Sequence, residues 1–95
     1  MTAIEEVRNR IEQIDYEIIK LIEERIGCAT DVLDIKKKEH MSINDGTQNH
    51  VVLDRATNAA TERNLDSGAV KEIFEILIRM SIEHQHELSG EGNLP

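Results

Sequence analysis

The segment that decides the fold is AIEEVRNRIEQIDYEIIKLIEERIGCATDVLDIKKK, residues 3–38. Apolar residues recur through it at alternating spacings of three and four, which is the period of one face of an α-helix. No glycine or proline interrupts it except Gly27, which costs about 1 kcal/mol relative to alanine. We therefore predict one helix from about residue 3 to residue 38. Its apolar stripe comprises Ile4, Val7, Ile11, Ile14, Ile18, Leu21, Cys28, Val32 and Ile35.

A cation interrupts this stripe. Arg25 stands where the spacing predicts another apolar residue. Such a stripe is normally buried against other helices, and burying a guanidinium is costly unless an anion or a strong hydrogen-bond partner receives it. Arg25 either forms a structural ion pair inside a bundle, or it marks the point where an acidic ligand enters. The segment alone is compatible with both interpretations.

The length of this helix predicts a second chain. At 1.5 Å per residue it is about 50 Å long, whereas a compact monomer of this size is about 30 Å across. A helix that is apolar along its whole length needs a partner beyond its own chain. We therefore expect a dimer.

Composition favours an all-α protein. The 95 residues include only two aromatic side chains, Tyr16 and Phe74, and one proline, which is unlike a sandwich or barrel. The net charge of −8 argues against nucleic acid as a partner. The one dense basic run, residues 36–38, complements the dipole at the end of the first helix.

Membrane association and secretion are not expected. No segment approaches the roughly 18 apolar residues of a membrane span, and the acidic N-terminus does not resemble a signal peptide. The single cysteine, Cys28, falls within the apolar series, so we interpret it as a buried core thiol rather than a nucleophile. A free thiol fits a reducing compartment, and we expect a cytoplasmic protein.

The rest of the chain predicts two shorter helices in one domain, residues 1–88. After a loop at residues 40–46, Asn44 or Asp45 caps a helix that ends near Asn64, with Gln48 positioned to complete a capping box. Its apolar face comprises Val52, Ala56, Ala59 and Ala60. Asp66 or Ser67 caps a third helix with the stripe Val70, Ile73, Phe74, Leu77 and Ile78. Residues 89–95 have the composition of a flexible tail.

Polar residues interrupt the third helix as well. Ser81 and Gln85 continue its apolar face, four residues apart and one above the other. Lys36 follows Arg25 by eleven residues, close to three turns, so both lie on nearly the same face with α-carbons about 16 Å apart. Two long cationic side chains leaning across that gap leave room for a small dianion.

Arg8 is a different case. It precedes Arg25 by seventeen residues, or about 25 Å along the helix. It cannot easily serve the same small site within one chain, but in a dimer of crossed long helices it can serve the site of the partner.

The sequence lacks the motifs of several common types of active site, which limits the functions it can have. No serine or cysteine has a histidine base at a recognised spacing, and no glycine-rich phosphate loop is present. His84 and His86 are two apart on a helix and face different directions, so no metal site and no cofactor are expected. Cations and amides without a nucleophile suit binding, or a reaction that needs only conformational and electrostatic help.

These residues resemble the all-helical chorismate mutases over nearly the whole chain. Residues 7–15 (VRNRIEQID) look like their opening helix, and so do residues 21–25 (LIEER) followed eleven residues later by Lys36. Residues 43–45 (IND) and residues 73–78 (IFEILI) match the same family in order and spacing. The polar positions that carry the resemblance jointly are Arg8, Arg25, Lys36, Asp45, Ser81 and Gln85.

The resemblance implies an intertwined homodimer of three-helix chains that rearranges chorismate, a small dianion, to prephenate on the way to phenylalanine and tyrosine. It implies that Arg25 and the partner's Arg8 clamp the substrate carboxylates, and that Lys36 and Gln85 donate to the ether oxygen as its bond breaks. Ser81 would support a carboxylate. Val32 and Ile78 would form apolar walls, and Asp45 belongs to the same binding site.

Two positions depart from the family. Many members have arginine and glutamate three and four residues after the loop aspartate, where this chain has Gln48 and Asn49. Asn49 can still accept a hydrogen bond from the ring hydroxyl without a charge, whereas Gln48 supplies no cation. These departures keep other interpretations open: a related helical pyruvate lyase acting on isochorismate, or a non-catalytic dimer that binds chorismate or serves as a helical interaction module.

Overall fold

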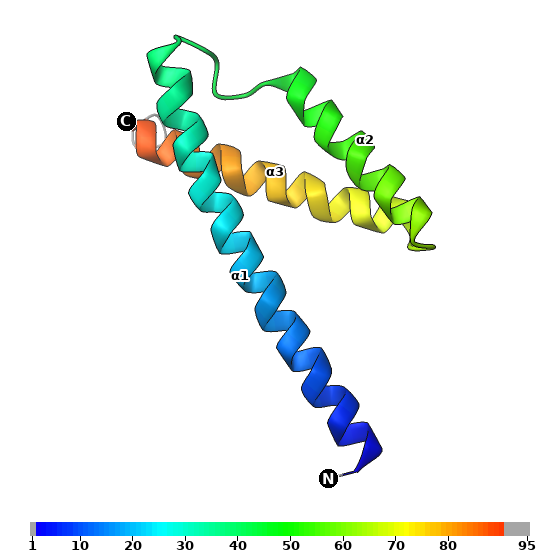
Figure 1. The fold of residues 1–95 in the computed structure, drawn as a ribbon. Helices are drawn as coiled ribbons and strands as arrows, with labels where there is room; N and C mark the ends of the chain where they lie inside the picture. The colour runs from blue at the N-terminus through cyan, green and yellow to red at the C-terminus, as the bar shows by residue number, and fades with distance from the viewer. Residues whose placement is uncertain (1, 91–95) are drawn as a thin grey trace.

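The computed structural model describes residues 2–90 and contains three α-helices (Figure 1). They are α1 (Ala3–Lys38), α2 (Gly46–Glu62) and α3 (Ser67–Ser89). The all-α, three-helix fold predicted from the sequence is confirmed.

Short polar side chains begin each helix. Thr2 and Glu5 form a reciprocal capping box on α1, with both bonds at 3.2 Å. Asp45 caps α2 by accepting from the backbone N–H of Gln48 at 3.1 Å. Asp66 caps α3 in the same way, through the N–H of Ala69. These caps give the helices defined starting points because each satisfies a backbone donor that has no partner inside the helix.

The helix ends differ slightly from the prediction. Helix α2 stops at Glu62, two residues before the predicted end, and Asn64 then adopts a left-handed φ of 58°. Asparagine tolerates this conformation better than most residues. Helix α3 includes Ser89 and stops at Gly90, whose φ is 83°. Residues 91–95 of the predicted tail lie outside the described residues.

Helix α3 is the element that contacts both others. It returns alongside α2 as a helical hairpin and crosses the C-terminal half of α1, while the N-terminal half of α1 projects away (Figure 1). The buried side chains of residues 2–90 are few because α1 is covered over only part of its length. They are Ala29 and Leu33 on α1, Val52, Ala56 and Ala60 on α2, and Gln85 on α3.

The face of α1 that packs within the chain is not the predicted stripe. Cys28 and Val32 are exposed, whereas the residues that follow them, Ala29 and Leu33, are buried. The prediction that Cys28 is a core thiol is therefore wrong for the single chain. The physical reason is that α3 packs against an adjacent face of α1, one residue further along.

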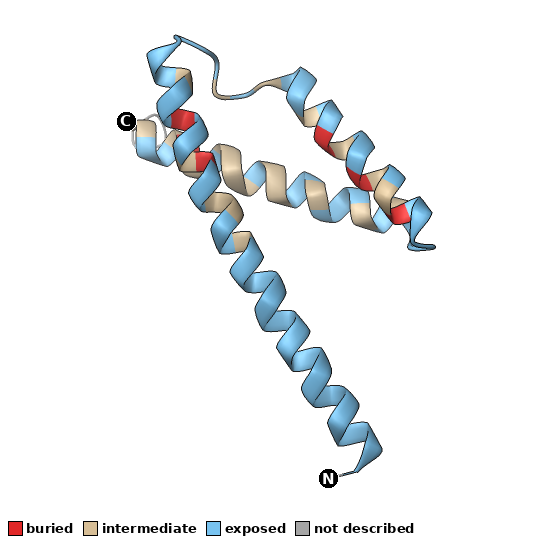
Figure 2. Ribbon diagram, in the orientation of Figure 1, coloured by how far each residue is buried: buried red, intermediate tan, exposed pale blue. Residues whose placement is uncertain are grey.

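The N-terminal half of α1 has no tertiary cover in the single chain (Figure 2). Its apolar residues between Ile4 and Leu21 are 38–61% exposed at the stripe positions. The chain measures 55 × 27 × 24 Å, and its radius of gyration is 16.9 Å, against about 12 Å for a compact chain of this length. The stripe has the exposure expected of a surface that a further chain would cover.

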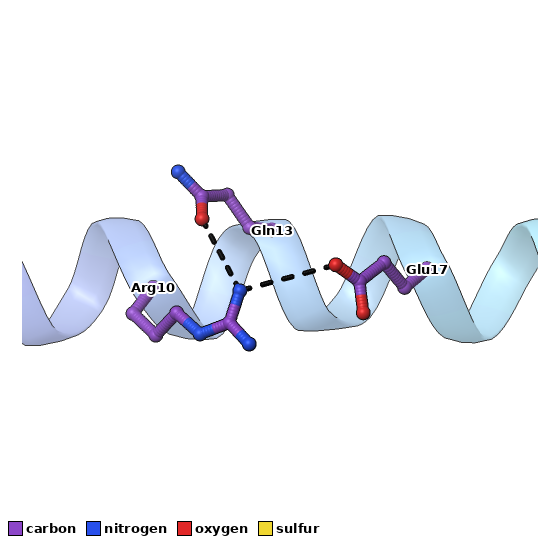
Figure 3. Close-up of polar contacts among 3 residues, drawn as sticks. All are labelled: Arg10, Gln13 and Glu17. Carbon is purple, nitrogen blue, oxygen red and sulfur yellow. Dashed lines mark hydrogen bonds and ion pairs between the residues drawn. The ribbon is translucent and has the colours of Figure 1, made fainter.

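The side chains in the N-terminal half of α1 contact one another within the helix. Arg10 Nη1 donates to Gln13 Oε1 at 3.3 Å and lies 3.9 Å from Glu17 Oε1 (Figure 3). Exposed ion pairs of this kind contribute about 0–1 kcal/mol. They support the helix but do not bury its apolar stripe. Separately, none of the helices in residues 2–90 is long and apolar enough to cross a membrane.

Replacing Gly27 with alanine should stabilise the protein. Gly27 lies inside α1, and a Cβ built there meets no atom within 4 Å. The Gly27→Ala variant should raise the free energy of unfolding by about 0.5–1 kcal/mol, because glycine loses more backbone entropy on entering a helix. Urea denaturation at fixed protein concentration measures the change. The control is Gly90→Ala, which should give no gain because φ is 83° there; a loss of stability at Gly27 would show that its surroundings are filled.

Candidate active site

One cavity of about 290 Å³ lies where the C-terminal half of α1, the following loop, α2 and α3 meet. This volume is close to the lower limit of about 300 Å³ for small-molecule pockets, so a compact ligand fits it. Residues from all three helices line it: Arg25, Cys28, Ala29, Val32, Lys36, Ile43, Asp45, Gln48, Asn49, Val52, Arg55, Ile78, Ser81, Ile82 and Gln85.

The cavity brings together nine of the ten residues that the sequence predicts for a site. Arg8 is the exception: it lies on the projecting half of α1, away from the cavity. The nine are Arg25, Val32, Lys36, Asp45, Gln48, Asn49, Ile78, Ser81 and Gln85. Their proximity is a structural fact, while the role of each in binding or chemistry stays a prediction.

Arg25 is half-buried and is held by neutral groups. Its Nη1 donates to Ser81 Oγ at 2.7 Å and to the Leu77 carbonyl at 3.1 Å. Within residues 2–90 the ion pairs are Arg10–Glu17 and Arg79–Glu83, so Arg25 is not part of a structural ion pair. Of the two interpretations of this cation, the structure favours a guanidinium that is available to an anion.

The surroundings of Arg25 destabilise its positive charge. Burial lowers the pKa of Arg25, and the positive charge of Arg55 lowers it further, with Cys28 acting in the opposite direction. An arginine stays protonated in spite of such a shift. A bound anion would therefore stabilise the positive charge of Arg25.

Lys36 and Gln85 are each anchored to the backbone. Lys36 Nζ donates to the Ile43 carbonyl at 2.6 Å, which ties the end of α1 to the loop. Gln85 is 4% exposed, and its Nε2 donates to the Ala29 carbonyl at 2.8 Å. An ammonium has three donors and a primary amide nitrogen has two, so each side chain keeps a donor for a ligand.

The start of α2 supplies the carboxylate of the cavity and two of its three side-chain amides. The carboxylate of Asp45 is oriented by its capping bond to the backbone of Gln48. This bond uses the N–H of Gln48 and not its side chain, which lines the cavity. Asn49 Nδ2 donates to Asn44 Oδ1 at 3.0 Å, which leaves Asn49 Oδ1 as an acceptor.

Six lining residues were not among the predicted site residues: Cys28, Ala29, Ile43, Val52, Arg55 and Ile82. Arg55 follows Gln48 by seven residues, or two helical turns, so the helical period puts it on the same face of α2 as two other lining residues, Gln48 and Val52. That spacing was the available signal. With Arg25, Lys36 and Arg55 against Asp45 alone, the lining carries a net positive charge although the whole chain carries −8.

No cluster of metal-binding side chains occurs among the described residues. His84 does not contribute to the cavity lining and is hydrogen-bonded to Thr30 at 3.1 Å, a contact that joins α3 to α1 beside the Gln85 bond. The polar groups of the cavity are thus cations, amides, a hydroxyl, the thiol of Cys28 and one carboxylate. They can bind and polarise an anion.

An all-α protein with a cavity lined by three cations and one carboxylate is the class that this fold and this cavity define. Residues 7–86 match the family Chorismate mutase type II, and the chain belongs to that family. The family predicted from the sequence is thereby confirmed.

The chain is similar to two proteins of known family over most of its length. The chain is 40% identical over 73 residues to a chorismate mutase of Methanocaldococcus jannaschii, covering 77% of this chain and 74% of that protein. It is 26% identical over 81 residues to a bifunctional chorismate mutase/prephenate dehydratase of Buchnera aphidicola subsp. Schizaphis graminum, covering 85% of this chain and 21% of that protein.

Removing the hydroxyl of Ser81 should destabilise the site. Ser81→Ala leaves the half-buried guanidinium of Arg25 with the Leu77 carbonyl alone, and should lower the free energy of unfolding by about 1–2 kcal/mol. Ser89→Ala, on the same helix, is the matched control. It removes only a local bond to the His86 carbonyl and should cost about 0.5 kcal/mol or less. Equal losses in urea denaturation would contradict the special role of Ser81.

Proposed function

We propose that this protein is a chorismate mutase, which rearranges chorismate to prephenate in the biosynthesis of phenylalanine and tyrosine. One observation carries the proposal: nine residues expected for that site line a single cavity although they come from three helices and a loop. Membership of the family supports it. So does the 40% identity to a protein that is named a chorismate mutase.

Binding would select the reactive shape of the substrate. The guanidinium of Arg25 is fixed by Ser81 and Leu77, so it can receive a carboxylate with little further ordering. The apolar side chains of Val32 and Ile78 would confine the ring and the enolpyruvyl arm. Holding two reacting ends of one molecule together lowers the entropic part of the barrier.

The chemical step needs donors rather than a nucleophile. A carbon–oxygen bond breaks while a carbon–carbon bond forms within the same molecule, and no proton has to move. Negative charge grows on the ether oxygen, where the free donors of Lys36 and Gln85 would point. Because this charge is larger in the transition state than in the substrate, such donors raise the rate.

The groups at the start of α2 would receive the ring hydroxyl. Asp45 and the free Oδ1 of Asn49 are the candidate acceptors. A neutral amide is a weaker acceptor than the carboxylate that many family members have at position 49. Gln48 lines the cavity and can bind the substrate only as a neutral group.

A homodimer in which Arg8 completes the site of the partner is part of the proposal. Support comes from the exposed stripe on the projecting half of α1 and from the distance between Arg8 and the cavity of its own chain. A two-fold axis would make both sites equivalent. A cytoplasmic location and the absence of nucleic-acid or membrane partners also belong to the proposal, on the grounds of the free Cys28 thiol and the acidic composition.

Replacing Lys36 with alanine should abolish turnover. The measurement is the loss of chorismate absorbance with purified protein, with the product identified as prephenate. Lys36→Ala should lower kcat at least about a hundredfold because a transition-state donor is lost. Lys37→Ala is the matched control, since it removes the same charge from the next position of α1, where the side chain is exposed and does not line the cavity. Near-normal activity of a folded Lys36→Ala variant removes Lys36 from the mechanism, and pyruvate formed from isochorismate would instead indicate the lyase.

Mixing two inactive variants should restore activity if the sites are shared between chains. Arg8→Ala and Lys36→Ala homodimers should each be nearly inactive. After joint unfolding and refolding in equal amounts, about half the dimers are mixed, and each mixed dimer has one intact site. Activity should recover to about a quarter of that of the wild type, given random exchange and independent sites.

The control for Arg8 is Arg10→Ala. Arg10 lies two residues further along α1 and is engaged with Gln13 and Glu17 on its own helix (Figure 3). Its replacement should leave turnover within about twofold of wild type, in line with the small value of exposed ion pairs. If mass spectrometry shows mixed dimers while activity stays at the level of the variants, Arg8 does not act across an interface.

A further inference from the structure

Arg55 is a cation that lines the cavity, and the proposed function assigns it no role. It lies on α2, is solvent-exposed, and lines the cavity with Gln48, Asn49 and Val52. Neither ion pair formed within residues 2–90 involves Arg55, and none of the hydrogen bonds among these residues occupies its guanidinium. An arginine in this situation has its donors available to a ligand.

Helical geometry aligns Arg55 with Gln48. Seven residues separate them, so they lie on the same face of α2 with a rise of about 10.5 Å between them. Val52 stands between them on that face and is buried. Arg55 therefore lines the same cavity as Gln48, from a position two turns further along α2.

The electrostatics of the cavity point the same way. Arg55 is near enough to Arg25 for its charge to lower the pKa of Arg25, and neither guanidinium belongs to an ion pair among the described residues. Two like charges facing one cavity are unfavourable by themselves. A carboxylate bound between or beside them would offset the repulsion and form charge-assisted hydrogen bonds with both.

We propose that Arg55 is a substrate-binding residue whose guanidinium binds a carboxylate of the dianionic substrate, replacing the arginine that many family members have at position 48. This inference rests on the proposed function, because it takes chorismate as the dianion. It explains how a chain with Gln48 keeps enough positive charge in its cavity. It also leaves Lys36 for the ether oxygen, since Arg25 and Arg55 are then the cations of the cavity that bind a carboxylate.

The test compares steady-state kinetics of Arg55→Ala with those of Arg63→Ala. Both variants remove an arginine from the α2 region, but Arg63 is the C-cap of α2, does not line the cavity, and bonds the Ala59 carbonyl. Arg55→Ala should raise KM for chorismate about tenfold or more, with kcat changed less than about threefold, because binding is lost in substrate and transition state alike. Arg63→Ala should leave both values within about twofold. Equal KM values for the two variants overturn the proposal.

A second substitution, at position 48, tests whether Arg55 takes the place of an arginine there. Adding Gln48→Arg to Arg55→Ala should return KM to within about threefold of wild type, since a second guanidinium reaches the same carboxylate. Arg55→Lys should show an intermediate KM, because lysine keeps the charge but not the bidentate geometry. A double variant as impaired as Arg55→Ala alone would show that Arg55 does not stand in for an arginine at position 48.

Calorimetric titration with chorismate separates this inference from the proposed function. A wild-type protein that consumes no chorismate contradicts the proposed activity. If that protein still binds chorismate, and Arg55→Ala weakens binding about tenfold, the role of Arg55 stands without catalysis. Equal binding by the wild type and Arg55→Ala, or binding by neither, overturns the proposal for Arg55.

Discussion

The half-buried guanidinium of Arg25, held by neutral partners, is the interaction on which the site depends. Removing a cation from water is costly, and the hydroxyl of Ser81 and the carbonyl of Leu77 offset only part of that cost because neither carries a charge. The same two bonds join α1 to α3 at the point where the helices cross. One side chain therefore joins the two helices and keeps a positive charge in the lining of the cavity.

The other polar groups of the cavity follow the same scheme. Lys36 is bonded to the loop, Gln85 to the backbone of α1, and Asn49 to Asn44, in each case with part of its hydrogen-bonding capacity left over. Protein contacts thus orient each group before a ligand arrives. Preorganised groups of this kind lose little entropy on binding and need no rearrangement as charge develops in a transition state.

A second constraint is the length of α1. The cavity lies at the C-terminal half of a 36-residue helix, while the other half has apolar residues in solvent when the chain is considered alone. With five buried apolar residues among those described, the chain has a small core of its own. Burial of the projecting stripe by a second chain would add apolar area and bring Arg8 near a site, so stability and completion of the site would come from the same contact.

The sequence by itself determined the helices, their caps and most of the lining of the site. Helical periodicity and short capping residues are local properties, so α1 was predicted from residue 3 to residue 38 and the caps at Asp45 and Asp66 were among those proposed. Resemblance to the family, confirmed by the match over residues 7–86, indicated nine of the lining residues. Only the tertiary structure decided which face of α1 meets α3, and hence that Ala29 and Leu33 are buried while Cys28 is exposed. It also decided that Arg25 has neutral partners, because this depends on how helices distant in sequence cross, which periodicity within one helix does not encode. For Arg55, the helical period indicated the face that it shares with Gln48, and the tertiary structure decided that this face lines the cavity.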